Sequence, residues 1–346
     1  MVKNLFFLLL IVILLCGCEI QPQNLCFSTT DSMSVIVDIY DENDCMVYSG
    51  FNAGYTNNNH NYKMPNTHNK IYKAVVYDEY RKKKIIEKRY KANVDSLLHI
   101  EFIACKQGLS VYLKYKDFNM LYDAGFGSSG YSEWQGSGVN YALEYLIKNN
   151  IEELSLVVIS HNHSDHIGGL SDIMKSDIDV KRIITHQNKF KYTDSSYLYN
   201  DDVKIKILSL HTPAGYSENN INNQSIVLKI VYDEFECLLS GDAEDLVFNY
   251  LLRNGKDLSS DVYQVSHHGS KNKVNSDKII KSILNQISKI AIFSFGKGNP
   301  YNHPEVVGYD NVSIYGTDEY KNLNDFKFEN IEIKTNGKLI FIKKRG

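Results

Sequence analysis

The stretch H-N-H-S-D-H at residues 161–166 constrains this chain more than any other feature of its sequence. It follows directly on the apolar run 154–160, which is typical of a buried strand. Two histidines at i and i+2 of an extended segment share one face, so their imidazoles can converge on one cation. Imidazole and carboxylate groups are common ligands of divalent metals, and the two glycines that follow allow a tight turn into a helix. The candidate ligands are His161, His163, Asp165 and His166.

Two later apolar runs end in the same way. The run 235–240 leads into Asp242, and the run 261–266 leads into His267 and His268. Taken alone, Asp242 would be read as the N-cap of a helix, and a histidine pair is a weak signal. Because functional sites of α/β folds gather where strands end, the three strand ends together predict one metal site.

The pattern of strands and helices divides the 346 residues into two predicted domains. Residues 31–97 alternate apolar and polar positions between turn signals, which predicts a small β-sandwich-like domain. Residues 98–346 mix buried strands with helical segments, which predicts an α/β (α+β) domain of sheets covered by helices. The segment 81–91 carries seven basic residues and one acidic residue. It is either a patch for phosphate groups or anionic surfaces, or a solvated hairpin whose lysines block aggregation.

Composition excludes several classes of protein. With 43% hydrophobic and 23% charged residues, the chain is neither mostly disordered nor a polytopic membrane protein. Its formal net charge of -3 provides no global positive field, so any binding of nucleic acid has to be local.

The N-terminal residues predict a location outside the cytoplasm. Residues 1–17 combine a basic residue with an apolar run too short to span a bilayer permanently, which is typical of a signal peptide. The signal ends in L-C-G-C, which resembles a bacterial lipoprotein signal, so Cys18 is the predicted lipidation site and residues 18–30 a polar tether. Acyl chains on Cys18 would anchor the protein to a bacterial membrane. The alternative is an ordinary secretory signal.

The remaining cysteines carry no metal pattern. Cys26 and Cys45 lie close together in the sequence, and a disulfide between them is left open. Cys105 and Cys237 each lie in an apolar run and are expected to be buried free thiols.

Seven motifs across residues 98–343 resemble, in their order, the metallo-β-lactamase fold superfamily. The closest likeness is to the extracellular domain of ComEC-type DNA-uptake proteins, here as a stand-alone lipoprotein. The antibiotic-degrading branch lacks the final histidine of the H-x-H-x-D-H motif, which this chain has. The motifs are Gln107-Gly108, Asp123-Ala124-Gly125, the stretch 161–166, Asn223-Gln224-Ser225, Ser240-Gly241-Asp242, His267-His268-Gly269-Ser270 and Asn302-His303-Pro304.

The resemblance implies an αββα sandwich with two divalent metal ions, zinc or alternatively manganese, along one edge of its sheets. Asp123 would orient a ligand. Members with the full pattern have a third histidine on the first metal, where this chain has Tyr216. His211 either replaces that ligand or is a surface residue. Leu109 stands where members of the family usually have Asp, and the sequence offers no explanation for this difference. The implied ligands are His161 and His163 for the first metal, Asp165, His166 and His267 for the second, and Asp242 between them.

Two such cations can share one water and lower its pKa, so that the bridging hydroxide is the nucleophile. Asp165 would be both a ligand and a hydrogen-bond partner of that hydroxide. The leaving oxygen needs a proton, for which His268 and His303 are the candidate donors. His303 is alternatively a structural residue ahead of Pro304.

These residues lead to three hypotheses. The first is a membrane-anchored, extracytoplasmic hydrolase of phosphoesters, with small molecules or extracellular nucleic acid as substrate and no obligate protein partner evident. The second is a hydrolase of carboxylic esters, lactones or amides. The third is a non-enzymatic surface protein with a structural metal site. Structural zinc sites are closed and often rich in cysteine, which argues against the third. The low net charge mildly disfavours long nucleic acid.

Overall fold

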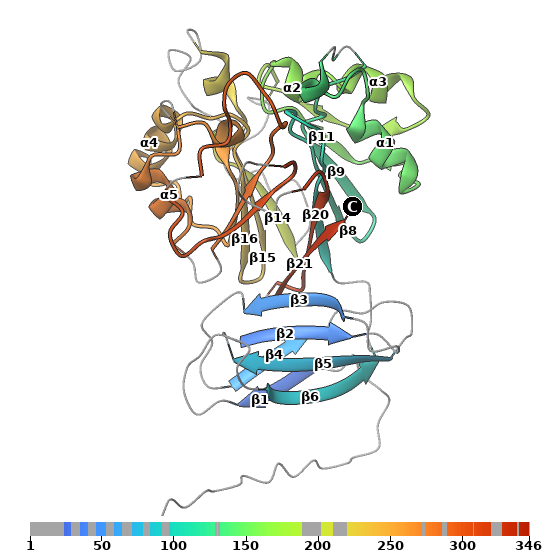
Figure 1. Cartoon of the computed structure of the whole chain (residues 1–346), viewed down its shortest axis with the longest axis vertical. Helices are drawn as coiled ribbons and strands as arrows, with labels where there is room; N and C mark the ends of the chain where they lie inside the picture. Colours follow the sequence, from blue (N-terminus) through green and yellow to red (C-terminus); the bar gives the residue numbers. More distant parts are fainter. Residues whose placement is uncertain are drawn as a thin grey trace, which may run out of the picture.

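The computed structural model shows a mixed α/β protein whose N-terminal strands lie beneath a larger body of sheets and helices (Figure 1). The structure describes residues 24–28, 35–40, 46–52, 59–63, 71–78, 84–91, 97–128, 130, 132–188, 202–209, 220–271, 274–285, 289–306, 308–319, 327–337 and 339–345.

The N-terminal strands fall into two groups. Strands β2, β3, β5 and β6 are antiparallel neighbours, and β1 pairs with β4 in a separate two-stranded sheet. Strands β5 and β6 form an antiparallel pair, and β6 contains part of the basic segment 81–91. Two of the strands lie where the sequence predicts none, β1 within the expected tether and β4 within an Asn-rich loop. The bounds are β1 (Asn24–Ser28), β2 (Val35–Tyr40), β3 (Met46–Asn52), β4 (Asn59–Lys63), β5 (Ile71–Asp78) and β6 (Lys84–Lys91).

The first large sheet continues from these strands. Among the described residues it has eleven strands in the order β13-β11-β9-β8-β7-β20-β21-β3-β2-β5-β6. The join is the antiparallel pair β21–β3, in which Ile340 lies opposite Phe51. The two predicted domains therefore share one sheet in this structure. The further bounds are β7 (Leu98–Phe102), β8 (Val111–Tyr115), β9 (Phe118–Tyr122), β11 (Leu156–Val158), β13 (Ile183–Ile184), β20 (Asn330–Thr335) and β21 (Leu339–Arg345).

The second large sheet has six strands among the described residues, in the order β14 to β19. Strands β14, β15 and β16 are antiparallel, whereas β16 to β19 run parallel. A short parallel pair, β10 (Glu153–Leu154) with β12 (Asp179–Val180), lies beside the first sheet. The bounds are β14 (Val203–Ile207), β15 (Leu228–Tyr232), β16 (Phe235–Leu239), β17 (Val262–Gln264), β18 (Ile290–Phe293) and β19 (Ser313–Gly316).

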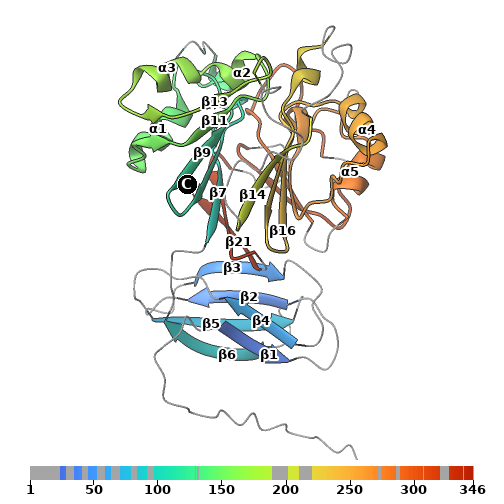
Figure 2. The same ribbon diagram turned by 180° about the vertical axis from the view of Figure 1, so that it is seen from behind.

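The two sheets face each other and helices cover their outer faces, as Figures 1 and 2 show. A continuous cluster of buried apolar side chains from both sheets, such as Val111 and Leu228, fills the space between them. A second cluster lies under the helices of the first sheet, and a third lies under those of the second. These layers are the αββα sandwich that the sequence predicts. The helices are α1 (Tyr141–Lys148), α2 (Ser164–Ile167) and α3 (Leu170–Lys175) on one side, and α4 (Asp245–Arg253) and α5 (Asp277–Ile283) on the other.

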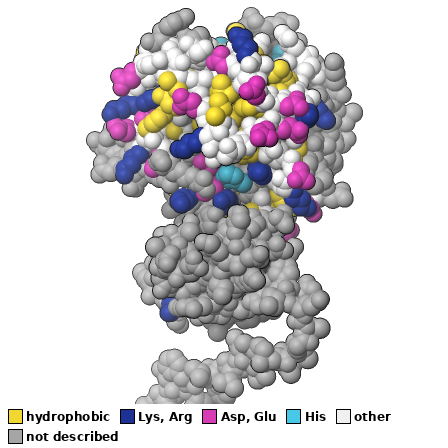
Figure 3. Space-filling view, turned by 90° about the vertical axis from the view of Figure 1, so that its right-hand side faces the viewer, with side chains coloured by type: hydrophobic (Ala, Val, Ile, Leu, Met, Phe, Trp, Pro, Cys, Tyr) yellow, Lys and Arg dark blue, Asp and Glu magenta, His cyan; other side chains and the backbone are white. Residues whose placement is uncertain are grey.

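The surface on the α1 and α3 side carries both signs of charge. Acidic and basic side chains alternate there with hydrophobic ones over the described part of the face (Figure 3). None of the described helices is both long and apolar enough to cross a membrane.

The parallel strands determine where a site can form. Strands β9 and β11 run parallel in the first sheet, and β16, β17 and β18 run parallel in the second. The chain leaves each of these strands at its carboxyl end, and the loops that follow carry the residues singled out in the sequence. One edge of the sandwich therefore collects the candidate metal ligands that the structure describes.

Candidate metal centre

The loop after β11 brings four predicted ligands to the edge of the sandwich. His161 and His166 are fully buried, and the rings of His161 and His163 meet edge-on with His161 Nε2 and His163 Nδ1 2.9 Å apart. The glycines that follow allow close approach rather than an unusual backbone. A Cβ on Gly168 would lie 2.2 Å from the Ser164 carbonyl oxygen, and one on Gly169 equally close to that of Ala124.

Asp123 holds this loop from behind. Its carboxylate accepts from the backbone N–H of Ser160 at 2.6 Å and from the Ser160 hydroxyl at 2.7 Å. The other contact of the carboxylate is with Nδ1 of His166, at 2.7 Å. Because Nδ1 of His166 is engaged, its Nε2 is left to face the site. Asp123 therefore has the orienting geometry that the resemblance implies.

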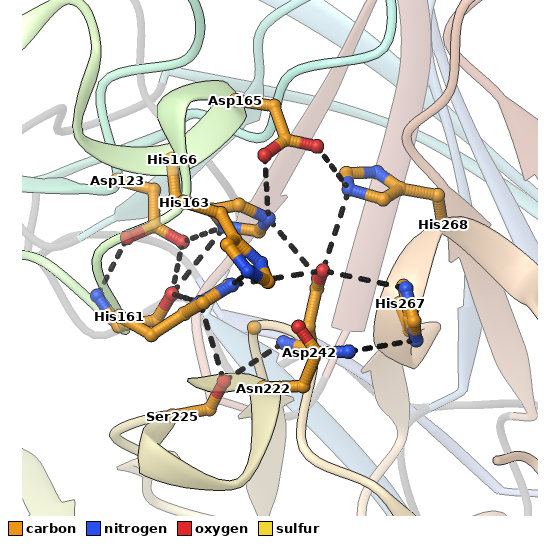
Figure 4. Close-up of polar contacts among 12 residues, drawn as sticks. Asp123, His161, His163, Asp165, His166, Asn222, Ser225, Asp242, His267 and His268 are labelled. Carbon is orange, nitrogen blue, oxygen red and sulfur yellow. Dashed lines mark hydrogen bonds and ion pairs between the residues drawn. The ribbon is translucent and has the colours of Figure 1, made fainter. Parts of the chain in front are cut away.

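Asp242 lies at the centre of the cluster (Figure 4). Its Oδ1 is 3.1 Å from His166 Nε2, and its Oδ2 is 3.8 Å from His161 Nε2. The same Oδ2 lies 3.7 Å from His268 Nε2 and 3.9 Å from His267 Nε2. Asp242 thus touches histidines from both sheets, the position expected of a ligand that bridges two ions.

The histidine pair after β17 is held in an uncommon backbone conformation. His267 and His268 have φ values of 50° and 53°, in the left-handed region that non-glycine residues rarely occupy. Such strain is found at functional sites, where the surrounding structure enforces it. Here it directs both imidazoles towards Asp242, and the Nδ1 of His268 is fixed by the carbonyl oxygen of Ser294 at 2.8 Å.

The structure separates the two histidines of this pair. His268 is buried, and its Nε2 lies 3.3 Å from Oδ2 of Asp165, while Oδ1 of Asp165 is 4.0 Å from His166 Nε2. His267 is a quarter exposed. The geometry therefore favours His268 beside Asp165 and His166, where the resemblance implies His267. The role of His267 as a ligand stays a prediction.

Three buried polar atoms converge at the centre within ion-pair distance of one another or of Asp165, yet none of them makes an aligned hydrogen bond within the described part of the chain. They are Nε2 of His166, Oδ1 of Asp242 and Nε2 of His268. Leaving such atoms unsatisfied is costly in a protein interior unless a ligand completes them. Ligand-capable atoms of His161, His166 and Asp242 lie within 4.8 Å of one another, and so do those of Asp165, His166 and His268. Nitrogen and carboxylate donors in this arrangement fit divalent metal ions.

The charges of the site are strongly coupled. Burial alone would lower the pKa of His166, but Asp242, Asp123 and Asp165 raise it well above its usual value. Burial lowers the pKa of His161, which favours the neutral form that binds metal. Burial would raise the pKa of Asp242, yet the neighbouring histidines, His166 first, hold it well below its usual range. A divalent cation would replace the positive charge that protonated histidines otherwise supply.

A pocket of about 300 Å³ opens over these residues. His303 lies in its wall, with its ring 5.5 Å from that of His267, and burial together with the charges of His268 and His267 lowers its pKa to about 4. Tyr301 is 61% exposed and stacks on His303 at 5.7 Å between ring centroids, and Trp134 meets Tyr301 edge-on at 5.9 Å.

Sequence reasoning did not single out every residue of the site. Ser160 was one omission, although its position directly before His161 at the end of a strand was a usable signal. The aromatic residues Tyr301 and Trp134 gave none, because they are far apart in the sequence. Cys105 and Cys237 are buried free cysteines, as expected. The predictions for Cys18, Cys45 and His211 concern residues outside the described part of the chain, and the side chain of Cys26 lies outside it as well.

The fold and the site agree with a comparison against known families. Residues 103–271 match the model of the metallo-beta-lactamase superfamily. The expectation drawn from the motifs is confirmed at this level, and it places the chain in a fold that carries metal-dependent hydrolases.

The relatives are competence proteins and proteins similar to them. Recombination protein 2 of Haemophilus influenzae is 29% identical over 210 residues, which cover 57% of this chain and 24% of that protein. ComE operon protein 3 of Bacillus subtilis is 25% identical, covering 59% of this chain and 29% of its own length. Competence protein ComA of Neisseria gonorrhoeae is 28% identical, and the match covers 61% of this chain and 29% of that protein. The matched part of this chain thus spans about a quarter of these relatives.

Solved structures show only distant likeness. A diphosphatase from the PhnP family covers 69% of this chain and 98% of its own, at 10% sequence identity and a TM-score of 0.36. A dizinc quorum-quenching lactonase covers 50% of this chain and 73% of its own, at 12% identity and a TM-score of 0.27.

Proposed function

We propose that the protein is a metal-dependent hydrolase that cleaves phosphoesters outside the cytoplasm. The observation that carries the proposal is the convergence beneath an open pocket of three buried atoms, from His166, Asp242 and His268, that lie at ion-pair distances but make no aligned hydrogen bond among the described residues. Two divalent ions at this position, zinc or manganese, would lower the pKa of a water molecule and offset negative charge that develops on the substrate. The ligands we propose are His161, His163 and Asp242 for one ion, and Asp165, His166, His268 and Asp242 for the other.

The chain's own residues supply orientation and proton transfer. Asp123 fixes the ring of His166, and the carbonyl oxygen of Ser294 fixes the ring of His268, so both present Nε2 to the centre. His268 is thereby engaged among the ligands. His303 lies in the pocket wall and is our candidate for proton transfer to the leaving oxygen. Its low pKa keeps it neutral in the free protein, and an anionic substrate beside it would raise that pKa.

The pocket supports a phosphoester with a flat substituent. Its described lining contains no Lys or Arg, so the negative charge of a phosphate would be met by the metal ions. The exposed ring of Tyr301 offers a surface on which a planar group next to the scissile bond can stack. A nucleobase has that shape, and the names of the relatives, competence and recombination proteins, also favour nucleic acid.

The size of the substrate is limited by charge. The face in Figure 3 mixes acidic and basic side chains and has no continuous basic track over its described residues. Long nucleic acid is usually held by such a track, because binding to the phosphate backbone depends on Lys and Arg. We therefore propose short or single-stranded nucleic acid, held at the pocket itself, as the substrate.

A panel of model substrates tests the reaction class. We expect metal-loaded protein to turn over bis(p-nitrophenyl) phosphate at a rate well above its rates on p-nitrophenyl acetate and a homoserine lactone. The contact with a flat substituent is tested by Tyr301→Ala, which should raise KM for a dinucleotide and leave KM for an aliphatic phosphodiester without a ring nearly unchanged. Turnover of the ester or lactone without turnover of the phosphodiester would show instead that the protein is a hydrolase of carboxylic esters or lactones.

The proposed location rests on Cys18 and is tested separately. We expect wild-type protein to sediment with the membrane fraction of a bacterial host, and Cys18→Ser protein to be released or to remain an unprocessed precursor. Cys16→Ser is the matched control, since it changes the neighbouring thiol within the signal and should leave anchoring intact. If Cys18→Ser fractionates as processed wild type does, the lipid anchor is ruled out.

A further inference from the structure

A second pocket lies between helix α1 and strand β7, away from the metal centre. Its volume is about 380 Å³, and no residue lines both pockets. One wall is a single face of α1, because positions i, i+3, i+4 and i+7 of a helix lie together. The lining is Glu101, Ile103, Ala104, Tyr141, Glu144, Tyr145, Lys148, Asn149, Phe328, Glu329 and Asn330.

One residue of this lining, Glu101, carries a buried carboxylate. The side chain of Glu101 is fully buried, and its Oε2 contacts Nε2 of His99 at 3.0 Å. Its Oε1 has no hydrogen-bond partner among the described residues. A buried carboxylate oxygen without a donor destabilises the folded protein, because it has lost its hydrogen bonds to water and has formed none within the protein. The best partner is a positively charged donor, because it would both form the missing hydrogen bond and offset the negative charge of the carboxylate.

The charged groups around Glu101 contact other atoms, so its Oε1 is the atom that a ligand could still reach. Glu101 lies directly opposite Glu332 in the pairing of β7 with β20, and His99 Nε2 contacts both carboxylates, at 3.0 Å and 3.1 Å. Lys334 Nζ lies 2.9 Å from Glu332 Oε1. His99 and Lys334 therefore already serve Glu332. A metal ion among His99, Glu101 and Glu332 would also meet the ammonium group of Lys334, so a ligand that enters from the pocket is the better fit.

The rest of the lining suits a cation with an apolar body. Two further carboxylates, Glu144 and Glu329, face a single basic residue, Lys148, within the described lining. The rings of Tyr141 and Phe328 meet edge-on with centroids 5.3 Å apart. The ammonium group of Lys106 already lies 4.2 Å from the centroid of the Phe328 ring, which shows that this ring accepts a cation.

From this arrangement we infer that the second pocket binds a small organic amine, whose ammonium group donates to Glu101 Oε1 while its apolar part packs against Tyr141 and Phe328. This site is independent of the proposed hydrolase activity. The volume lies in the range of small-molecule sites in proteins, and it accommodates an amine about the size of phenethylammonium.

Calorimetric titration of the full chain with phenethylammonium tests the inference. The neutral isostere 2-phenylethanol and the anion phenylacetate are the comparison ligands. We expect saturable binding of the amine, binding of the alcohol that is weaker by about tenfold or more, and no binding of the anion. Equal affinity for amine and alcohol, or no saturable binding of the amine, would overturn the inference.

Two variants locate the binding. Glu101→Gln should weaken binding of the amine by about tenfold or more, whereas Glu144→Gln, on the exposed wall of the same pocket, should weaken it less because solvent screens that charge. Tyr141→Ala, at a partly exposed position, should weaken binding severalfold and serves if Glu101→Gln does not fold. Wild-type affinity in Glu101→Gln or in Tyr141→Ala contradicts the inference. Retention of an extra zinc ion by wild type that Glu101→Gln loses would assign the cluster to a metal instead, and would also overturn it.

Discussion

His268 Nε2 and Asp165 Oδ2 lie 3.3 Å apart, although their residues come from loops on different sheets of the sandwich. This contact joins the loop after β11 to the loop after β17. It also decides which histidine of the pair enters the metal centre, because the left-handed backbone at both positions turns His268 inwards and leaves His267 nearer the pocket opening.

The first prediction separates the two histidines by metal content. His268→Ala removes a buried ligand beside Asp165 and His166, so we expect it to retain less metal than wild type after dialysis. His267→Ala is the matched control, since it changes the same side chain at the adjacent position, and it should retain metal as wild type does. Elemental analysis of the three proteins is the measurement. The reverse order would assign the ligand to His267, as the family resemblance implies.

The second prediction concerns Asp165. Asp165→Ala should lower phosphodiester turnover by at least about a hundredfold, the scale at which loss of one preorganised electrostatic contact is felt. The fold should persist, because Asp165 belongs to the short helix α2 outside the buried strands. Asn162→Ala, at an exposed position of the loop before helix α2, is the control. Full activity in Asp165→Ala would remove this residue from the reaction.

The third prediction follows the free energy of unfolding with pH. Burial would lower the pKa of His99, but Glu101 and Glu332 raise it above 6.5. A raised folded-state pKa means that the contribution of His99 is fully present below pH 6.5 and is lost as the pH rises through the higher value. The difference in unfolding free energy between wild type and His99→Gln should therefore shrink as the solution is made alkaline.

Urea denaturation of both proteins across a pH series measures this difference. Glu332 acts at the other end of the scale, because its pKa is held below 4.5 by His99 and Lys334 despite burial, so its contribution is lost as the pH falls below 4.5. A difference that stays constant from pH 6 to pH 9, or one that grows, would show that His99 is not charged in the folded protein.

The sequence predicted most of the large domain because its signals are local. Apolar runs 154–160 and 261–266 contain β11 and β17, and the ligand-rich loops that follow them have an unmistakable composition. It did not predict β1 or β4, whose segments are rich in Asn and other polar residues and gain strand structure by pairing with each other. Nor did it predict that β21 pairs with β3, since register between distant strands leaves no local pattern.

The sequence named many of the residues at the site, but it did not predict how they are arranged. Sequence spacing placed His161 and His163 together, but it gave no means to rank His267 against His268. That ranking depends on two consecutive residues with positive φ, a conformation that histidine rarely adopts and that only the surrounding chain enforces. The glycines at 168 and 169 were expected for a tight turn, whereas the structure needs them for close contact with two carbonyl oxygens.

The most direct test of the account is a titration of metal-free protein with zinc or manganese, in which bound metal and phosphodiester turnover are followed together. We predict that turnover is absent without metal, rises as the ions bind, and levels off when two ions are held per chain. Asp242→Asn, which weakens the residue between the two groups of ligands, should lose both metal and turnover. Turnover that is unchanged in chelator, or metal that binds fully without any hydrolysis of phosphodiester, ester or lactone, would contradict the account.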